Sequence, residues 1–199
     1  MNTDLLLALV GFAFASSVTP GPNNLMLMAS GANFGLRRSL PHMFGISLGH
    51  AFMVTLVGLG LGQVFDTYPA ARLVLQVLST AYVLYLAWKI ATAAPPRAGE
   101  ARGKPFTFLQ AAAFQWVNPK AWYMAIYAVT NYTPPEAGVL TGALIVAGVF
   151  AATNLPSITL WATIGTQLRR LLTRPRLLRG FNWTMAGLLV LTLLPVWLG

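Results

Sequence analysis

The chain has 199 residues, of which 56% are hydrophobic and only 9% are charged, whereas soluble domains average about 25% charged residues. The 13 lysines and arginines, 4 acids and 2 histidines are too few to cover the surface of a water-soluble globule. The composition therefore excludes an ordinary cytosolic domain. It predicts one domain, residues 1–199, that lies in a lipid bilayer.

Residue types that hold metals or cofactors are scarce. The chain has no cysteine, two histidines and four scattered acids, so it lacks thiolates and a carboxylate cluster for a metal site. We therefore expect no metal and no cofactor. The net charge of +9 does not indicate a nucleic-acid partner, because the basic residues lie between long apolar runs instead of forming a patch on a polar fold.

Six apolar runs approach or exceed the length of about 20 residues that a helix needs to cross a bilayer. We therefore predict an all-α membrane protein with six transmembrane helices. The first run has no basic residue before it and continues past a small-residue stretch that resembles a cleavage site, so we expect a retained helix. The predicted helices are Leu5–Phe34, Leu40–Gly62, Ala70–Thr92, Phe106–Asn131, Gly138–Gly165 and Phe181–Leu198.

Basic residues gather at alternate connections between the predicted helices. Two lie after the first helix, four around the end of the third and five after the fifth, which together make 11 of the 13. The positive-inside rule places these connections in the cytoplasm and therefore both termini outside. The residues are Arg37, Arg38, Lys89, Arg97, Arg102, Lys104, Arg169, Arg170, Arg174, Arg176 and Arg179.

A proline- and glycine-containing linker, residues 93–105, divides the chain into two halves of three helices, about 1–92 and 106–199. Because three is an odd number, the halves have to lie in the membrane in opposite orientations, as in inverted-repeat transporters. Thr19-Pro20-Gly21-Pro22-Asn23 interrupts the first helix, and Asn118-Pro119-Lys120 interrupts the fourth. We therefore predict two inverted three-helix repeats with broken helices 1 and 4.

These breaks contain the residue types of a substrate site. Proline stops a helix, while Asn118 followed by Pro119 suits the cap and first position of a new one. Each new helix presents free N–H groups and a positive dipole end, which favour a carboxylate. The alternative is that the prolines only kink the helices. We predict substrate contacts from Thr19, Pro20, Gly21, Pro22, Asn23, Asn118, Pro119, Lys120 and Asn154.

Apart from tyrosines such as Tyr123 and Tyr127, two titratable residues lie deep within predicted helices. Lys120 costs about 2.5 to 3.5 kcal/mol to insert, which makes a functional role the default hypothesis. The alternative to a functional role is that the Lys120 side chain reaches the membrane interface or bonds to nearby carbonyls. His50 either hydrogen-bonds across helices or takes up a proton. Both are therefore candidates for proton coupling.

Side-chain amides accompany the same breaks. Asn154 precedes a proline in the fifth helix, and Asn23, Asn24 and Gln115 lie at similar depth. Each amide either contacts substrate or holds helices together.

These motifs occur together in a known family. Thr19-Pro20-Gly21-Pro22-Asn23, Gly49-His50 and Asn118-Pro119-Lys120-Ala121 resemble the LysE/RhtB family of bacterial amino-acid exporters over essentially the whole chain. Asn154-Leu155-Pro156-Ser157 and Phe181-Asn182-Trp183 are similar to its cysteine and O-acetylserine branch. The resemblance implies a multi-pass transporter of the cytoplasmic (inner) membrane that exports amino acids in exchange for protons.

The predicted core favours a small neutral amino acid, and the resemblance implies one of the cysteine/O-acetylserine or homoserine/threonine type. The dipole ends and Lys120 suit its carboxylate, while its ammonium would contact asparagine oxygens, unwound carbonyls or the faces of Trp116 and Trp122. No acid lies within a predicted core segment, so a second cationic group would lack a partner. Substrate, proton and lipid are the expected partners, and the sequence leaves open whether the chain forms a homo-oligomer.

Two other classes of protein compete with this interpretation. An ion channel or metal-ion exporter should contain rings of carboxylates or soft ligands, which the sequence lacks. An intramembrane enzyme would need a nucleophile and a base, for which Ser16, Ser17 and His50 could be nominated without a motif that joins them. Neither class explains the two matching breaks, so we do not expect an enzyme.

Overall fold

The computed structural model describes residues 2–93, 104–172 and 174–198, and these residues form helices without any strand. The chain begins with two helices, α1 (Thr3–Val18) and α2 (Pro22–Phe34), which are bent by 54° relative to each other. Pro22 stands in the first turn of α2, where its missing N–H is not needed. The predicted break in the first helix is therefore confirmed.

A sharp turn at Gly35 leads into α3 (Leu36–Gly58). The φ angle of Gly35, 78°, lies in the left-handed region that favours glycine. The helix starts four residues before the predicted Leu40, because the backbone stays helical through the exposed arginines of its first turn, and it ends four residues before the predicted Gly62. Two short helices follow, η1 (Leu61–Gln63) and α4 (Val64–Thr67).

The other long helices differ from the prediction mainly at charged ends. α5 (Ala70–Ala91) agrees with the predicted Ala70–Thr92 to one residue. α8 (Val139–Leu171) continues past Gly165, and α9 (Pro175–Leu191), followed by α10 (Leu194–Leu198), begins before Phe181. Arginines end an apolar run but do not end a helix, since they are good helix formers.

The predicted fourth helix is divided into three pieces: α6 (Phe108–Phe114), η2 (Gln115–Val117) and α7 (Pro119–Tyr132). At 1.5 Å per residue, α6 is about 10 Å and α7 about 21 Å long, so neither crosses a core of about 30 Å alone. By length and composition, the described residues contain four candidate membrane spans, or five if α1 and α2 form one. The fourth predicted span is missing from this set.

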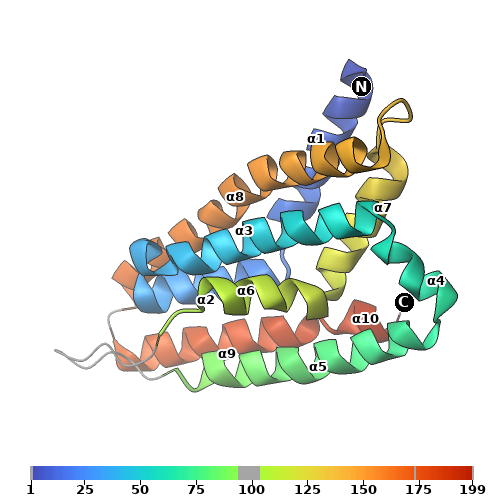
Figure 1. Cartoon of the computed structure of the whole chain (residues 1–199). Helices are drawn as coiled ribbons and strands as arrows, with labels where there is room; N and C mark the ends of the chain where they lie inside the picture. The colour runs from blue at the N-terminus through green and yellow to red at the C-terminus, as the bar shows by residue number, and fades with distance from the viewer. Residues whose placement is uncertain (1, 94–103, 173, 199) are drawn as a thin grey trace.

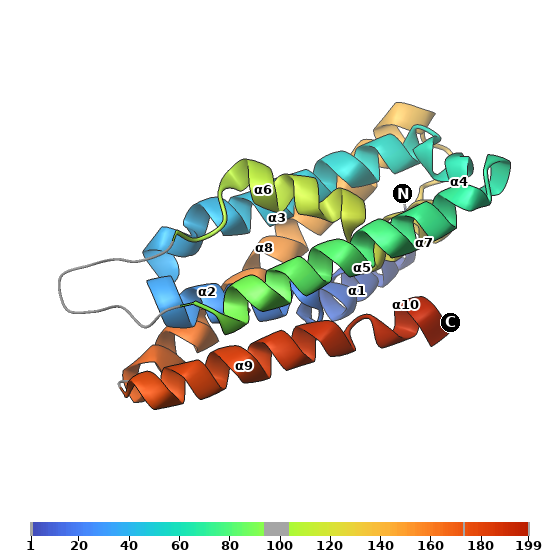
Figure 2. The ribbon, with the colours of Figure 1, turned by 90° about the horizontal axis from the view of Figure 1, so that it is seen from below.

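Figures 1 and 2 show how the helices pack. α8 lies against α1, α2 and α3, while α3 also contacts α6 and α7, and α5 pairs with α9. The backbones of α2 and α8 touch so closely that a Cβ at Gly31 would overlap the carbonyl oxygen of Ala162, and one at Gly165 would overlap that of Met28. Glycine is therefore required at both positions.

The connections between helices are sorted to opposite ends of the molecule. The α2–α3 turn, the α8–α9 connection and the end of α5 lie at one end, whereas both termini, α4 and the α7–α8 loop lie toward the other (Figures 1 and 2). The first end contains the connections in which the sequence concentrates its basic residues. Part of the predicted linker, residues 94–103, lies outside the described residues.

Candidate functional site

The two predicted breaks meet in the structure. Asn118 begins α7 by accepting a hydrogen bond from the Lys120 N–H at 3.2 Å. Gly21 precedes α2 in an extended conformation that any residue could adopt, so its small size has another reason. A Cβ at this position would lie 2.9 Å from Cδ and 3.1 Å from Nζ of Lys120. Gly21 therefore makes room for the lysine.

Lys120 reaches across to the end of α1. Its ammonium donates to the Thr19 carbonyl oxygen at 2.8 Å, to the Thr19 hydroxyl at 3.0 Å and to the Pro20 carbonyl oxygen at 3.5 Å. The C-terminus of a helix is its negative end, where a cation is favourable. Lys120 thus bonds to nearby carbonyls, as the alternative interpretation expected, and it does so at the other break.

Amide side chains join the same elements. Asn23 Nδ2 donates to Gln115 Oε1 at 2.9 Å, and Gln115 Nε2 donates back to Asn23 Oδ1 at 3.2 Å. Asn24 Nδ2 donates to the carbonyl oxygens of Ser17 and Thr19, both at 2.8 Å. These amides hold helices together in this conformation, which was one of the two roles expected for them.

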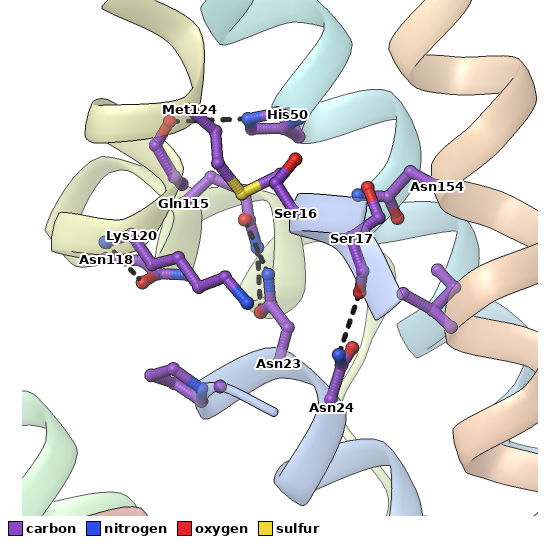
Figure 3. Close-up of a pocket in the computed structure, with 14 residues that line it drawn as sticks. Ser16, Ser17, Asn23, Asn24, His50, Gln115, Asn118, Lys120, Met124 and Asn154 are labelled. Atoms are coloured by element: carbon purple, nitrogen blue, oxygen red, sulfur yellow. Dashed lines mark hydrogen bonds between the residues drawn. The ribbon is translucent and has the colours of Figure 1, made fainter. Parts of the chain in front are cut away.

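A small cavity of about 20 Å³ lies where the broken helices meet (Figure 3). This space holds about one water molecule. Among the residues that line the cavity, one is cationic, most of the others carry amides or hydroxyls, and none is acidic. They are Ser16, Ser17, Gly21, Pro22, Asn23, Asn24, His50, Gln115, Asn118, Lys120, Ala121, Met124, Asn154 and Ile158.

A larger cavity of about 410 Å³ lies next to the small one, and we call it the vestibule. It is mostly apolar and extends between α5, α7 and the end of α9. Four residues line both spaces: Gly21, Pro22, Asn118 and Lys120. The two breaks and the lysine therefore stand between the small cavity and the vestibule.

Three side chains at the small cavity have a buried polar atom without a hydrogen-bond partner: Ser17 Oγ, His50 Nδ1 and Asn154 Oδ1. His50 is fixed at its other nitrogen, since Nε2 lies 3.3 Å from the Ala121 carbonyl oxygen. Its ring also packs edge-on against Phe150, with centroids 5.0 Å apart. Buried polar groups are normally hydrogen-bonded, so these three atoms need an explanation.

The structure brings the residues predicted at the two breaks, together with His50 and Asn154, to this region. Most line the small cavity, while Pro20 and Pro119 line the vestibule and Thr19 contacts Lys120. The sequence did not single out Met124 or Ile158, and nothing in their residue types marked them.

Two residues proposed as substrate contacts lie elsewhere. Trp122 donates from Nε1 to the Trp116 carbonyl oxygen at 2.9 Å, and the two rings pack edge-on with centroids 5.9 Å apart. Neither lines the small cavity. Within the part of the chain that the structure describes, no group of three or more metal-binding side chains is close enough to hold an ion.

The chain is similar to a known protein family and to proteins within it. The model of the LysE type translocator family matches residues 14–194. The cysteine/O-acetylserine efflux protein of Escherichia coli strain K12 is 31% identical over 173 residues, which cover 86% of this chain and 87% of that protein. The protein of the same name from Klebsiella pneumoniae is 31% identical over 196 residues, covering 96% and 95%.

No solved structure matches the chain. The family match nevertheless confirms the resemblance that the two proline motifs carried. It covers both breaks and every residue that lines the small cavity. The chain belongs to the LysE type translocator family and is a transporter, not an enzyme.

Proposed function

We propose that this protein exports small neutral amino acids of the cysteine and O-acetylserine class from the cytoplasm, in exchange for protons. The observation that carries the proposal is the 31% identity, over nearly the full length of both chains, to proteins named for the efflux of these two compounds. The residues that line the small cavity support a substrate with a neutral side chain. The described residues that line this cavity include no acidic side chain, so a second cationic group on the substrate would have no partner there.

The start of α2 and Lys120 form the proposed carboxylate site. α2 has no side-chain cap, so the first N–H groups of this helix are available to an anion. Lys120 lies beside them and donates to neutral carbonyl oxygens. A substrate carboxylate would be a stronger acceptor for the ammonium. We therefore expect the lysine to exchange these carbonyls for the substrate.

The packing supports the proposal of two inverted halves. The broken helix of the first half, α1 and α2, lies against α8, while that of the second half, α6 and α7, lies against α3. Each broken helix thus contacts the corresponding long helix of the other half, and α5 pairs with α9. We propose that both breaks lie within the inner membrane, with the basic connections in the cytoplasm and both termini outside.

The small cavity corresponds to a closed state of the transport cycle. A space of about 20 Å³, which holds about one water molecule, is too small for an amino acid. Two sets of contacts close the space: the Asn23–Gln115 amide pair and the Lys120–Thr19 hydrogen bonds. Both join the first half of the chain to the second. We propose that they separate when substrate enters.

Transport by the purified protein in lipid vesicles tests this function. Vesicles loaded with labelled cysteine, O-acetylserine, threonine, lysine or glutamate are followed with and without a higher proton concentration outside. We expect efflux of the small neutral amino acids, stimulated by the proton gradient, and little efflux of lysine or glutamate. Preferred lysine efflux, or an ion current without amino-acid efflux, would contradict the proposal.

A further inference from the structure

Three residues that line the small cavity, each on a different helix, have an unpaired buried polar atom. Ser17 on α1, His50 on α3 and Asn154 on α8 are 4%, 2% and 5% exposed. Ser17 Oγ, His50 Nδ1 and Asn154 Oδ1 have no hydrogen-bond partner. Since a packed interior normally satisfies such atoms, their convergence on one cavity indicates a polar ligand group that binds there.

The three atoms share the ability to accept a hydrogen bond. The Asn154 amide oxygen is an acceptor only, and the Ser17 hydroxyl has free lone pairs. For His50, Nε2 faces the Ala121 carbonyl oxygen at 3.3 Å. A carbonyl only accepts, so the ring proton of a neutral His50 belongs on Nε2, and Nδ1 presents a lone pair. An ammonium group offers three N–H donors and matches such a set.

We propose that Ser17, His50 and Asn154 form the subsite for the α-ammonium group of the substrate. This inference rests on the proposed amino-acid export. It adds a site for the ammonium group of the substrate to the proposed site for its carboxylate. Lys120 and these three residues face the same space from different sides (Figure 3). The carboxylate would thus bind at the breaks while the ammonium binds between α1, α3 and α8.

The subsite also links the substrate to a proton. A protonated imidazole carries hydrogen on both ring nitrogens and has no acceptor left, so protonated His50 cannot bind the ammonium. Phe150 of α8 and the Ala121 carbonyl of α7 pack against the ring. Among the described residues of the cavity wall, Lys120 of α7 is the other titratable group, and α1, α2, α8 and η2 supply only neutral side chains. Substrate and proton therefore bind in turn.

The chain offers matched controls for the variants. Ser79 is fully buried, and its hydroxyl also has no partner, but it lies on α5 and does not line the cavity. His42 lies on α3 like His50, is equally buried and has two unpaired ring nitrogens, again outside the cavity wall. If the loss of any buried polar atom were enough to weaken binding, substitutions at Ser79 and His42 would have the same effect as substitutions at the three cavity residues.

The experiment compares cysteine with its deamino analogue 3-mercaptopropionate, which keeps the carboxylate and the thiol. Dissociation constants are measured from the thermal stabilisation that each ligand gives to the purified full-length protein. We expect Ser17→Ala, His50→Phe and Asn154→Leu to weaken cysteine binding about tenfold each and to leave analogue binding unchanged, because each removes one hydrogen bond to a charged group. Ser79→Ala and His42→Phe should keep the wild-type preference for cysteine.

Variants that weaken both ligands equally, or neither, would overturn the subsite. Lowering the pH gives a second test: it should weaken cysteine binding to the wild type more than to His50→Gln, whose glutamine keeps an acceptor oxygen but does not titrate, and equal weakening would also overturn the subsite. Failure of the export proposal looks different, since the wild-type protein would then move no amino acid across vesicles.

Discussion

The Lys120 ammonium donates a 2.8 Å hydrogen bond to the carbonyl oxygen of Thr19, a residue 101 positions earlier in the chain. One broken helix thereby supplies the cation that caps the C-terminus of the other. The contact stabilises the end of α1, where unpaired carbonyls carry a partial negative charge. It also holds the ammonium beside the N-terminus of α2, where a substrate carboxylate would bind. The same side chain can therefore cap the end of α1 and bind a substrate carboxylate at the start of α2.

Lys120→Met separates the carboxylate role from the capping role. If Lys120 reads the carboxylate, the variant should fold and insert normally and lose at least about tenfold of its preference for an amino acid over its methyl ester, since a charge-assisted hydrogen bond is lost. The measurement is competition by free acid and methyl ester in vesicle transport. Lys89→Met, a change on α5 outside both cavities, serves as the control.

A purely capping lysine would give the opposite pattern. The preference of Lys120→Met for the free acid would then be unchanged. A lower melting temperature does not decide between the two roles, because the hydrogen bonds to the end of α1 are lost in either case.

Gly31→Ala tests the close approach of α2 and α8. The new methyl group would overlap the Ala162 carbonyl oxygen, so the helices have to separate, and overpacking of this kind costs about 1 to 3 kcal/mol or more. We expect a clear fall in melting temperature and in transport. Gly148→Ala, on α8 with no atom within 4 Å of the new Cβ, should leave both unchanged or raise stability slightly. Equal effects of the two changes would contradict this account.

The sequence predicted the breaks from local motifs in which proline follows glycine or asparagine. Pro22 and Pro119 both begin new helices, each after a residue with an extended backbone, Gly21 or Asn118. Pro41 and Pro156, in contrast, lie inside α3 and α8, so proline alone does not end a helix.

Helix ends were predicted less well. The predicted fifth helix ends at Gly165, because Arg169 and Arg170 interrupt the apolar run, yet α8 continues to Leu171. Apolar runs measure the depth of the bilayer, whereas backbone hydrogen bonds determine the length of a helix.

The contacts within the site could not be predicted. The position of Lys120 predicted either a substrate contact or bonds to nearby carbonyls, but it could not identify Thr19 as the partner, since that contact depends on how two distant breaks pack. The unpaired atoms of Ser17 and Asn154 were equally invisible, because the absence of a partner is a property of the packed interior. Residue type indicated which groups are polar, and the fold determined which of them remain unsatisfied.

Single cysteines test the proposed orientation, since the chain has none of its own. Glu136→Cys, in the α7–α8 loop, should react with an impermeant thiol reagent added to intact cells. Arg174→Cys, at the start of α9, should react only after the membrane is permeabilised. The reason is that the basic connections stay in the cytoplasm. Labelling of Arg174→Cys in intact cells would reverse the topology.

Proton coupling is tested by the double variant His50→Gln, Lys120→Gln. Glutamine at position 50 still offers an acceptor oxygen but does not titrate. The ammonium subsite should therefore still bind substrate, but this binding should no longer compete with protonation of residue 50. We expect exchange of labelled for unlabelled amino acid to persist at a reduced rate, while accumulation driven by a pH gradient is lost. His42→Gln, a change outside the cavity wall, should retain both activities. If the double variant still accumulated substrate in response to the gradient, neither residue would carry the proton, and the coupling would have to reside in a group outside the small cavity.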